Sequence, residues 1–368
     1  MKKNTPYNSK QHISIIGTVG VPACYGGFES LVDNLLDFTP ENVEYTVFCS
    51  EKSYSKKLET YKGAKLIYLP LSANGIQSIP YDIKSMWLSR KSDIILVLGV
   101  SGCLFLPILK LFSKAKIITN IDGLEWKRDK WGKVARTILK LSEKFAVKFS
   151  DIVIGDNKGI TDYVKNEYPK IAGKKQIELI AYGGDHVSKI NDDSLFEEYS
   201  FCKNPYAVTV CRIEPENNIH VILDAFSSIN NTLVIVGNWE KSEYGRALKE
   251  KYSAFSNIHI LDPIYEPNKI NWLRSNAAVY IHGHSAGGTN PSLVEAMNLG
   301  LPILAFDCIY NRATTQEKCL YWKSSEDIKN LLLEKENVFE KIAHDMQEEG
   351  NRLYSWENIS RLYNNLFC

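Results

Sequence analysis

Two polar segments in the second half of the chain have residue types that could hold a phosphate group. The first follows the apolar run Ala207–Cys211 and begins with Arg212, after which come Glu214-Pro215-Glu216-Asn217-Asn218. An arginine at the carboxyl end of a buried strand presents a planar fork of N–H donors, which suits bidentate binding of a phosphate. A salt bridge from Arg212 to Glu214 or Glu216 is the alternative, and this segment alone leaves both interpretations open.

The second polar segment is a glycine-rich loop that leads into a helix. It runs from Gly283 to Asn290 after the apolar run Val279–His282, and it contains Gly287-Gly288-Thr289. Asn290 is a good N-cap and Pro291 suits the first helical position, so the sequence predicts a helix that begins here. A helix N-terminus beside such a loop offers backbone N–H groups and the positive end of the helix dipole, which together favour a diphosphate.

Three side chains around this helix could take part in binding. Glu295 lies one turn inside the helix and could accept hydrogen bonds from ribose hydroxyls; the alternative is an ordinary capped helix with Glu295 on a solvated face. His282 and His284 would share one face of a continued strand, so a zinc pair has to be considered. No third ligand with suitable spacing is near and no Asp-x-Asp occurs, so we expect no metal site.

The first half of the chain has a glycine-rich loop of its own. After the first apolar run come Gly17-Thr18-Val19-Gly20-Val21-Pro22-Ala23 and Tyr25-Gly26-Gly27-Phe28-Glu29. Four glycines between a strand and a helix let backbone amides approach a ligand closely. The spacing is neither G-x-G-x-x-G nor a Walker loop, which argues against nicotinamide and kinase chemistry. A tight strand-to-helix turn is the alternative.

A further polar cluster follows the apolar run Lys116–Thr119. It reads Asn120-Ile121-Asp122-Gly123-Leu124-Glu125-Trp126-Lys127-Arg128. Asp122 and Glu125 are candidates for binding sugar hydroxyls or for handling a proton. Turn formation by Asp-Gly explains Asp122 alone almost as well.

Short apolar runs alternate with longer helical patterns, which predicts parallel sheets with crossover helices. The runs are too apolar to be half-exposed, as expected when helices cover both faces of a sheet. In the first half the predicted strands lie near His12–Ile16, Tyr45–Cys49, Lys65–Leu69, Ile94–Leu98, Lys116–Thr119, Ile152–Ile154 and Ile177–Ile180. In the second half they lie near Ala207–Cys211, Leu233–Val236, Ile258–Leu261, Val279–His282 and Ile303–Phe306.

The length and a polar break divide the chain into domains. At 368 residues the chain exceeds the size at which one core stops growing. The break falls near Tyr182-Gly183-Gly184-Asp185, which predicts an α/β fold of two doubly wound, Rossmann-like domains over residues 1–184 and 185–351. Open α/β sheets bind ligands at the carboxyl ends of their strands, so we expect the site in a cleft that both sheets face.

The composition excludes several classes of function. The formal net charge of +1 gives no reason to expect a nucleic-acid partner. The eight cysteines are scattered without a C-x-x-C pair, which favours a reducing cytoplasm. Residues 1–10 lack the apolar core of a secretory signal. The uncharged stretch Ile94–Leu109 is too short for a membrane span and is interrupted by glycine and proline, so we expect a strand, a turn and a helix start.

Together these segments resemble the retaining GT-B glycosyltransferases of family four, and within it the bacterial rhamnosyltransferases of capsule and cell-wall polysaccharide assembly. The resembling segments span nearly the whole chain. They are Gly17–Ala23, Tyr25–Glu29, Asn120–Trp126, Gly155–Asn157, Ala181–Asp185, Arg212 with Glu214–Asn218, His282–Met297, and Tyr354–Ile359.

The resemblance implies a function and a set of roles. It implies transfer of L-rhamnose from dTDP-rhamnose, with no cofactor beyond this nucleotide-sugar donor, to a lipid-diphosphate-linked saccharide acceptor. Residues 1–184 would be the acceptor side, 185–351 would bind the donor, and a terminal helix over 352–368 would cross back onto the first domain. The catalytic set would be Asp122, Arg212 and Glu295. The donor-binding set would be Gly26, Gly27, Arg212, Asn218, His282, Gly287, Gly288, Thr289, Asn290, Ser292, Leu293 and Glu295, and the acceptor-side set would be Tyr25, Glu29 and Glu125.

Two departures from the wider family keep other functions open. Asn217-Asn218 stand where a lysine usually follows the arginine, and Gly287 replaces the first acidic residue of the usual Glu-x7-Glu pattern. A catalytically weak sugar-nucleotide-binding protein is therefore one alternative. A GT-B-like sugar-nucleotide epimerase, which would need no acceptor, is another.

A basic segment indicates a membrane surface as a further partner. Residues 127–148 carry eight basic residues against Asp129 and Glu143, whereas the whole chain has a net charge of +1. Val134, Ile138, Leu141 and Phe145 recur there at helical spacing. We expect this apolar stripe to pack, at least in part, on the sheet. The basic excess predicts a cytoplasmic protein that is peripheral on the inner face of the bacterial membrane.

Overall fold

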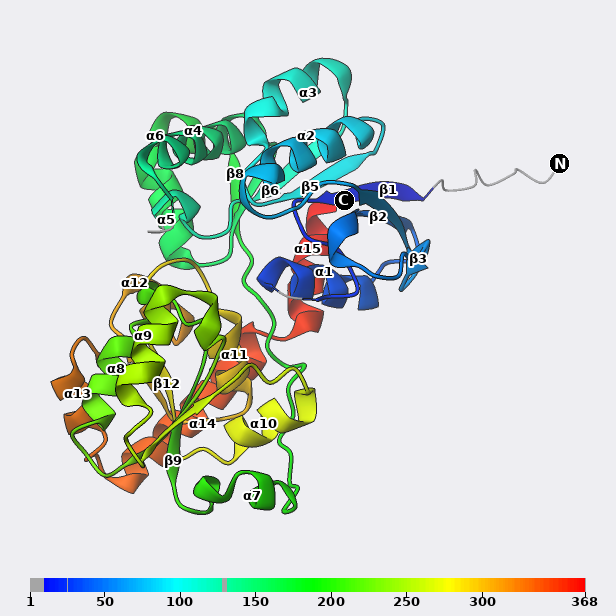
Figure 1. Cartoon of the computed structure of the whole chain (residues 1–368). Coiled ribbons are helices and arrows are strands. Elements are labelled where there is room, and N and C mark those ends of the chain that lie inside the picture. Colours follow the sequence, from blue (N-terminus) through cyan, green and yellow to red (C-terminus); the bar gives the residue numbers. More distant parts are fainter. Residues whose placement is uncertain (1–9, 25, 128–130, 368) are drawn as a thin grey trace. The chain divides into compact units, whose positions relative to one another are not determined.

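The computed structural model describes residues 10–24, 26–127 and 131–367 (Figure 1). The chain forms two compact units. The first comprises the residues up to Ala181 together with those from Ile359 onward, and the second comprises Tyr182–Asn358.

The first unit is built on an eight-stranded sheet with the order β3-β4-β2-β1-β5-β6-β7-β8. All neighbouring strands are parallel except the short β3, which pairs antiparallel with β4. The strands are β1 (Gln11–Ile16), β2 (Val43–Ser50), β3 (Thr60–Tyr61), β4 (Ala64–Leu69), β5 (Ile94–Leu98), β6 (Lys116–Asn120), β7 (Ile152–Gly155) and β8 (Gln176–Leu179).

Helices cover both faces of this sheet. One face carries α2, α3, α4 and α6, and the other carries α1 and α15 (Figure 1). The helices are α1 (Gly27–Asp37), α2 (Ser78–Leu88), α3 (Leu106–Phe112), α4 (Lys133–Phe149), α5 (Lys158–Glu167), α6 (Pro169–Ala172) and α15 (Trp356–Phe367). The terminal helix α15 is tied to the sheet because Asn120 Nδ2 donates to the Tyr363 hydroxyl at 2.8 Å and Gln11 Nε2 donates to the Phe367 carbonyl at 2.7 Å.

The second unit has a six-stranded, fully parallel sheet with the order β11-β10-β9-β12-β13-β14. Its strands are β9 (Tyr206–Val210), β10 (Thr232–Val236), β11 (Ile258–Leu261), β12 (Val279–His282), β13 (Ile303–Phe306) and β14 (Leu320–Trp322). Its helices are α7 (Leu195–Glu198), α8 (Ile219–Phe226), α9 (Glu243–Tyr252), α10 (Pro267–Ser275), α11 (Pro291–Asn298), α12 (Ile309–Thr314), α13 (Ser325–Leu331) and α14 (Glu336–Leu353).

The predicted strands all occur in the structure, with ends that differ by at most two residues. Two short strands, β3 and β14, were not predicted. The expectation that every run is deeply buried is wrong for the edge strands β8 and β11, where Leu179 is 48% exposed. An edge strand has a neighbour on one side only, so less of its surface is covered.

The uncharged stretch that follows Asp93 is confirmed as a strand, a turn and a helix start. It folds as β5, a 3-10 turn over Cys103–Phe105, and α3. No helix among the described residues is both long enough and apolar enough to cross a membrane.

Candidate functional site

In the second sheet the chain changes direction between the neighbouring strands β9 and β12. From β9 it continues through β10 to the edge strand β11, and from β12 it continues through β13 to β14 at the opposite edge. The loop that follows β9 and the loop that follows β12 therefore start from neighbouring strands and lead toward opposite edges of the sheet. Open α/β sheets bind ligands at such a point, outside the carboxyl ends of the strands.

These two loops are fastened to each other by hydrogen bonds. Asn218 Nδ2 donates to the Gly283 carbonyl at 2.8 Å, and His284 Nδ1 lies 2.9 Å from Asn217 Oδ1. Asn217 Nδ2 also donates to the Arg212 carbonyl at 2.7 Å. A Cβ on Gly283 would lie 2.0 Å from the Asn217 carbonyl oxygen, so only glycine permits this approach. The structure thus brings the two phosphate-binding candidate segments together with a fixed backbone.

Arg212 lies at this junction with its side chain 38% exposed. Its Nη1 is 3.6 Å from Glu214 Oε2, so the salt bridge that competes with phosphate binding is present. At this distance and exposure the pair is a weak, solvent-screened contact rather than a hydrogen bond. An anion with higher charge density can therefore compete with Glu214 for the guanidinium group.

The N-terminus of α11 uses its own amides more fully than the sequence predicts. Asn290 is confirmed as the N-cap, since its Oδ1 accepts from the Ser292 amide at 3.0 Å. The amides of Leu293 and Val294 donate to the Asn290 carbonyl at 3.0 and 3.2 Å. The expectation that this first turn offers unused N–H groups is therefore wrong, because the cap satisfies them.

The donors that remain lie in the loop before the helix. Within the part of the chain that the structure describes, the amides of Gly287 and Gly288 have no hydrogen-bond partner. Gly287 adopts a φ of +114°, a backbone conformation that residues other than glycine rarely adopt. Thr289 is buried beside them. The backbone of this glycine pair, together with the dipole of α11, supplies the positive potential for an anion.

Glu295 forms a buried ion pair, which contradicts the alternative of a solvated face. Its Oε2 is 2.6 Å from Arg274 Nη2 and its Oε1 is 3.2 Å from His186 Nε2, with side-chain exposures of 14% for Glu295 and 6% for Arg274. Burial alone would raise the pKa of Glu295, but the Arg274 charge and the hydrogen bond from His186 outweigh it, so this pKa is lowered. Glu295 is held ionised.

His186 is oriented by a second hydrogen bond. Trp356 Nε1 donates to its Nδ1 at 3.1 Å, so the proton sits on Nε2 and points to Glu295. Neither His186 nor Arg274 was predicted from the sequence as a site residue. The available signals were an arginine among the apolar residues Trp272 and Leu273 of a helix, and a histidine directly after the domain break.

His282 and His284 do not form a metal pair in this arrangement. Their ring centroids are 6.1 Å apart, and His284 Nδ1 is held by Asn217. His282 is 3% exposed, and its Nε2 has no hydrogen-bond partner among the described residues. Burial lowers the pKa of His282 to about 3, so the ring is neutral at physiological pH.

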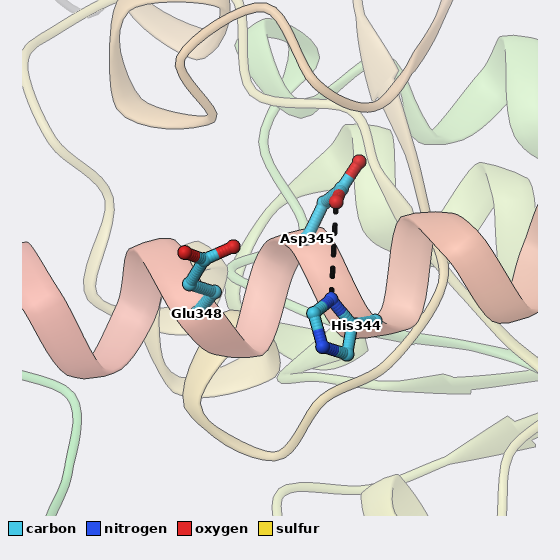
Figure 2. A group of neighbouring side chains, drawn as sticks. All are labelled: His344, Asp345 and Glu348. Atoms are coloured by element: carbon cyan, nitrogen blue, oxygen red, sulfur yellow. Dashed lines mark ion pairs between the residues drawn. The ribbon is translucent and has the colours of Figure 1, made fainter.

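A different group of possible metal ligands lies on α14. His344, Asp345 and Glu348 point outward from one turn of this helix (Figure 2). His344 is 79% exposed and lies 3.9 Å from Asp345, which also accepts an ion pair from Lys341. Exposed acidic groups with a lysine among them are common on helix surfaces, so we assign no metal site to this cluster.

In the first unit the corresponding change of direction lies between β1 and β5. Gly17, at the end of β1, has a φ of +85°, and a Cβ there would lie 2.0 Å from the Leu98 carbonyl oxygen at the end of β5. The loop then runs to Gly26, the N-cap of α1, and Gly27, its first residue. Tyr25 lies outside the described residues.

The buried carboxylate of Glu29 accepts hydrogen bonds from this loop. It is 6% exposed, and its Oε1 accepts from Thr18 Oγ1 at 2.8 Å and from the Val19 amide at 2.6 Å. Burial raises its pKa, hydrogen bonds from Val19 and Thr18 oppose the rise, and the charge of Asp122 adds to it. Glu29 therefore faces the loop's own backbone, and Asp122 lies within electrostatic reach of it.

Asp122 and Glu125 lie in the loop that follows β6. Asp122 has a φ of +56°, which is sparsely populated for residues other than glycine, and its amide donates to Asn120 Oδ1 at 3.0 Å. Glu125 accepts from Trp131 Nε1 at 3.0 Å. The structure thus gathers Asp122, Glu29 and the glycine-rich loop in the first unit, while Glu125 is engaged by a tryptophan.

Comparisons with known proteins agree with this architecture. The structure resembles a sucrose-phosphate synthase from Thermosynechococcus elongatus, with a TM-score of 0.81 and 16% identity over 97% of this chain and 99% of that chain. It also resembles HepE of Anabaena in complex with UDP-glucose, with a TM-score of 0.75 and 13% identity over 97% and 98% of the two chains. The catalytic domain of starch synthase IV from Arabidopsis thaliana, bound to ADP and acarbose, gives a TM-score of 0.70 and 13% identity over 98% and 99%. The predicted GT-B fold is confirmed.

Family comparisons divide the chain in the same way. Residues 191–319 match the family described as Glycosyl transferases group 1, and residues 10–185 match a domain of unknown function (DUF1972). No curated protein matches the sequence. The group 1 match contains both fastened loops, Arg274 and Glu295. A GT-B fold with this match supports a glycosyltransferase.

Proposed function

We propose that this protein is a retaining glycosyltransferase that moves L-rhamnose from dTDP-rhamnose to a lipid-diphosphate-linked sugar. The observation that carries the transferase proposal is the junction of the β9 and β12 loops. There Arg212, the amides of Gly287 and Gly288, and the ionised Glu295 belong to one region of one domain, and that region matches Glycosyl transferases group 1. Solved neighbours of the same fold hold UDP and UDP-glucose.

The chemistry follows from where charge develops during transfer. As the glycosidic bond to the diphosphate breaks, negative charge collects on the leaving phosphate oxygens. The Arg212 fork and the Gly287 and Gly288 amides are hydrogen-bond donors that can stabilise this charge without rearrangement, since the loop is already fixed. In a retaining reaction, an oxygen of the departing phosphate takes the acceptor hydroxyl proton.

Glu295 is suited to the ribose. Each of its oxygens receives one donor, from Arg274 or from His186, and an ionised carboxylate oxygen can accept a further hydrogen bond. Ribose hydroxyls are donors of the required kind. In the first unit, Asp122 is the proposed contact for sugar hydroxyls, whereas Glu29 shapes the loop that contains Gly26 and Gly27.

The rhamnose donor is supported by the resemblance of the His282–Met297 and Asn120–Trp126 segments to rhamnosyltransferases. The residue at position 287 is also consistent with a rhamnose donor. Gly287 removes a carboxylate that would otherwise bind sugar hydroxyls, and a 6-deoxy sugar has one hydroxyl fewer to bind. A site built for a methyl group rejects an added hydroxyl only about a hundredfold, so some use of other donors is expected.

The test is a transfer assay with purified protein, a panel of nucleotide sugars, and a lipid-diphosphate-linked sugar as acceptor, with products identified by mass. We expect transfer of rhamnose from dTDP-rhamnose, reduced in Arg212→Lys and unchanged in Arg246→Lys, a matched arginine on α9. A uridine-diphosphate hexose that outperforms the rhamnose donor tenfold would refute the donor. Equal rates with an acceptor lacking lipid and diphosphate would refute the acceptor.

The same assay separates the alternatives. Donor binding without turnover in the presence of every acceptor indicates a binding protein. Conversion of the nucleotide sugar without acceptor indicates an epimerase.

A further inference from the structure

The apolar stripe of α4 faces outward rather than into the core. Val134, Ile138 and Leu141 are 75%, 38% and 46% exposed. The helix is buried instead through Leu139, Ser142, Glu143, Ala146 and Val147. The expectation that the stripe packs on the sheet is therefore wrong for these three residues. A helix that packs through one set of positions while a second apolar set faces solvent has surface left for a partner.

The neighbouring helix α3 extends this apolar surface. Ile108, Leu111 and Phe112, spaced three and four positions apart on one face, are 48%, 78% and 60% exposed. Helix α3 contacts α4, and both lie on the same face of the first sheet (Figure 1). On the α2 side the ring of Trp87, itself 39% exposed, packs edge-on against Phe112 at 5.5 Å.

Basic residues surround these apolar side chains. The segments 106–116, 133–149 and 169–175 contain three, five and three lysines or arginines, and the acidic residue within them is Glu143. Glu143 is 3% exposed and accepts hydrogen bonds from Trp126, Tyr163 and Tyr168, so its charge is withdrawn from the surface. Just outside these segments, Asp151 pairs with Lys110 and Glu167 pairs with Lys140. The remaining lysines and arginines leave the outer side of α3, α4 and α6 with an excess of positive charge, in a chain of net charge +1.

Two hollows in this surface are lined by the same basic residues. One, of about 790 Å³, is lined by Arg136, Lys144 and Lys170 beside the apolar Leu141, and its lining also includes Glu167, which pairs with Lys140. The other, of about 320 Å³, is lined by Lys110, Lys114 and Lys116 with Asp151. Each hollow has lysines at its edge and lies next to exposed apolar side chains.

We propose that this α3–α4 surface docks on an anionic lipid bilayer. Leu111, Phe112 and Val134 enter the boundary between headgroups and acyl chains, and the lysines of the two hollows bind headgroup phosphates. Exposed aliphatic side chains within a basic rim are the pattern of interfacial membrane binding. A nucleic acid would use the lysines but leave the exposed aliphatic residues in water. The inference goes beyond glycosyl transfer and stands without it.

The experiment is flotation of the full-length protein with vesicles of phosphatidylcholine alone or mixed with phosphatidylglycerol. One variant, Leu111→Ser/Val134→Ser, removes apolar surface, and another, Lys144→Gln/Lys170→Gln, removes charge. Matched controls are Leu333→Ser, which is 82% exposed on the second unit, and Lys341→Gln, which is 75% exposed there. Circular dichroism melting of each variant checks that it is folded.

We expect wild type and both controls to bind anionic vesicles at low salt and to be released as salt rises. Loss of two lysines near an anionic surface should weaken binding about 30-fold, at roughly 1 kcal/mol per charge. The variant Leu111→Ser/Val134→Ser should bind the same vesicles about tenfold more weakly, or weaker still. Failure of wild type to float with anionic vesicles at low salt overturns the proposal, as does equal loss in the controls.

Two further readouts separate this proposal from others. A concentration-dependent dimer that Leu111→Ser/Val134→Ser disperses, without vesicle binding, would show that the surface holds a second copy and would overturn the proposal. Transfer to a soluble acceptor should be unchanged in both variants. Absence of any transferase activity would refute the proposed function while leaving the vesicle result intact.

Discussion

Replacement of Glu295 by glutamine should destabilise the second unit strongly. The change keeps the shape of the side chain but removes the charge that compensates Arg274. Arg274 is 6% exposed, and its Nε already lacks a hydrogen-bond partner among the described residues. The guanidinium group would then be a buried cation that faces a neutral amide.

The magnitude follows from the burial of the pair. Removal of one partner of a buried ion pair costs about 3–5 kcal/mol, and the 14% exposure of Glu295 places this pair near the lower end, at about 3 kcal/mol. For a folding unit of about 150–250 residues, 1 kcal/mol shifts Tm by roughly 2–4 °C, so Tm should fall by about 6–12 °C. Arg274→Gln should lower the free energy of unfolding by less than Glu295→Gln does, because His186 still donates to Glu295.

The pH dependence has a defined sign. The folded-state pKa of Glu295 is lowered, so its contribution to stability is present above the unfolded pKa and is lost as pH falls through the folded value. Urea unfolding of wild type, Glu295→Gln, Arg274→Gln and the double variant at pH 7 and pH 4 measures this. A cost below 1 kcal/mol at pH 7, or strictly additive single changes, would refute the ion-pair account.

Three other predictions concern donor binding, metal and pH. Arg212→Ala should weaken donor binding by about 1–3 kcal/mol, the range for hydrogen bonds to a charged group, and unchanged affinity in calorimetry would remove Arg212 from the site. Activity should survive chelator, because Arg212 and the glycine amides supply the positive potential; loss in chelator that magnesium or manganese restores would contradict this. Burial raises the pKa of Asp82 on α2 to about 8, so its contribution to the free energy of unfolding is fully present below its unfolded pKa and is lost as pH rises through 8. Asp82→Asn, which keeps an acceptor for the Gly102 amide, should therefore raise stability at pH 7 by roughly 4 kcal/mol, and denaturant curves with the same pH slope as wild type would refute it.

Much of the fold follows from local patterns in the sequence. Buried parallel strands are short apolar runs, so β5 and β10 could be located to within a residue or two. Asn290 and Pro291 fix the start of α11 because a cap and a proline act within one turn. The short strands β3 and β14 lack such a run, and only pairing with β4 and β13 makes them strands.

The partners of the candidate site residues could not be predicted in the same way. Arg274 and His186 reach Glu295 from other elements, and nothing in the sequence around Glu295 specifies them. Periodicity shows that α4 has an apolar stripe but not which of its faces meets the sheet. The structure buries Ser142 and Glu143 because Val100, Trp126 and two tyrosines bond to them, and it turns Val134 outward.

The central claim is tested most directly by following one reaction by NMR, with dTDP-rhamnose and a lipid-diphosphate-linked sugar as the substrates. The account predicts a new glycosidic linkage with the donor's anomeric configuration, and release of one nucleoside diphosphate for each linkage formed. Donor consumption that does not depend on the acceptor, or a linkage of inverted configuration, would contradict it.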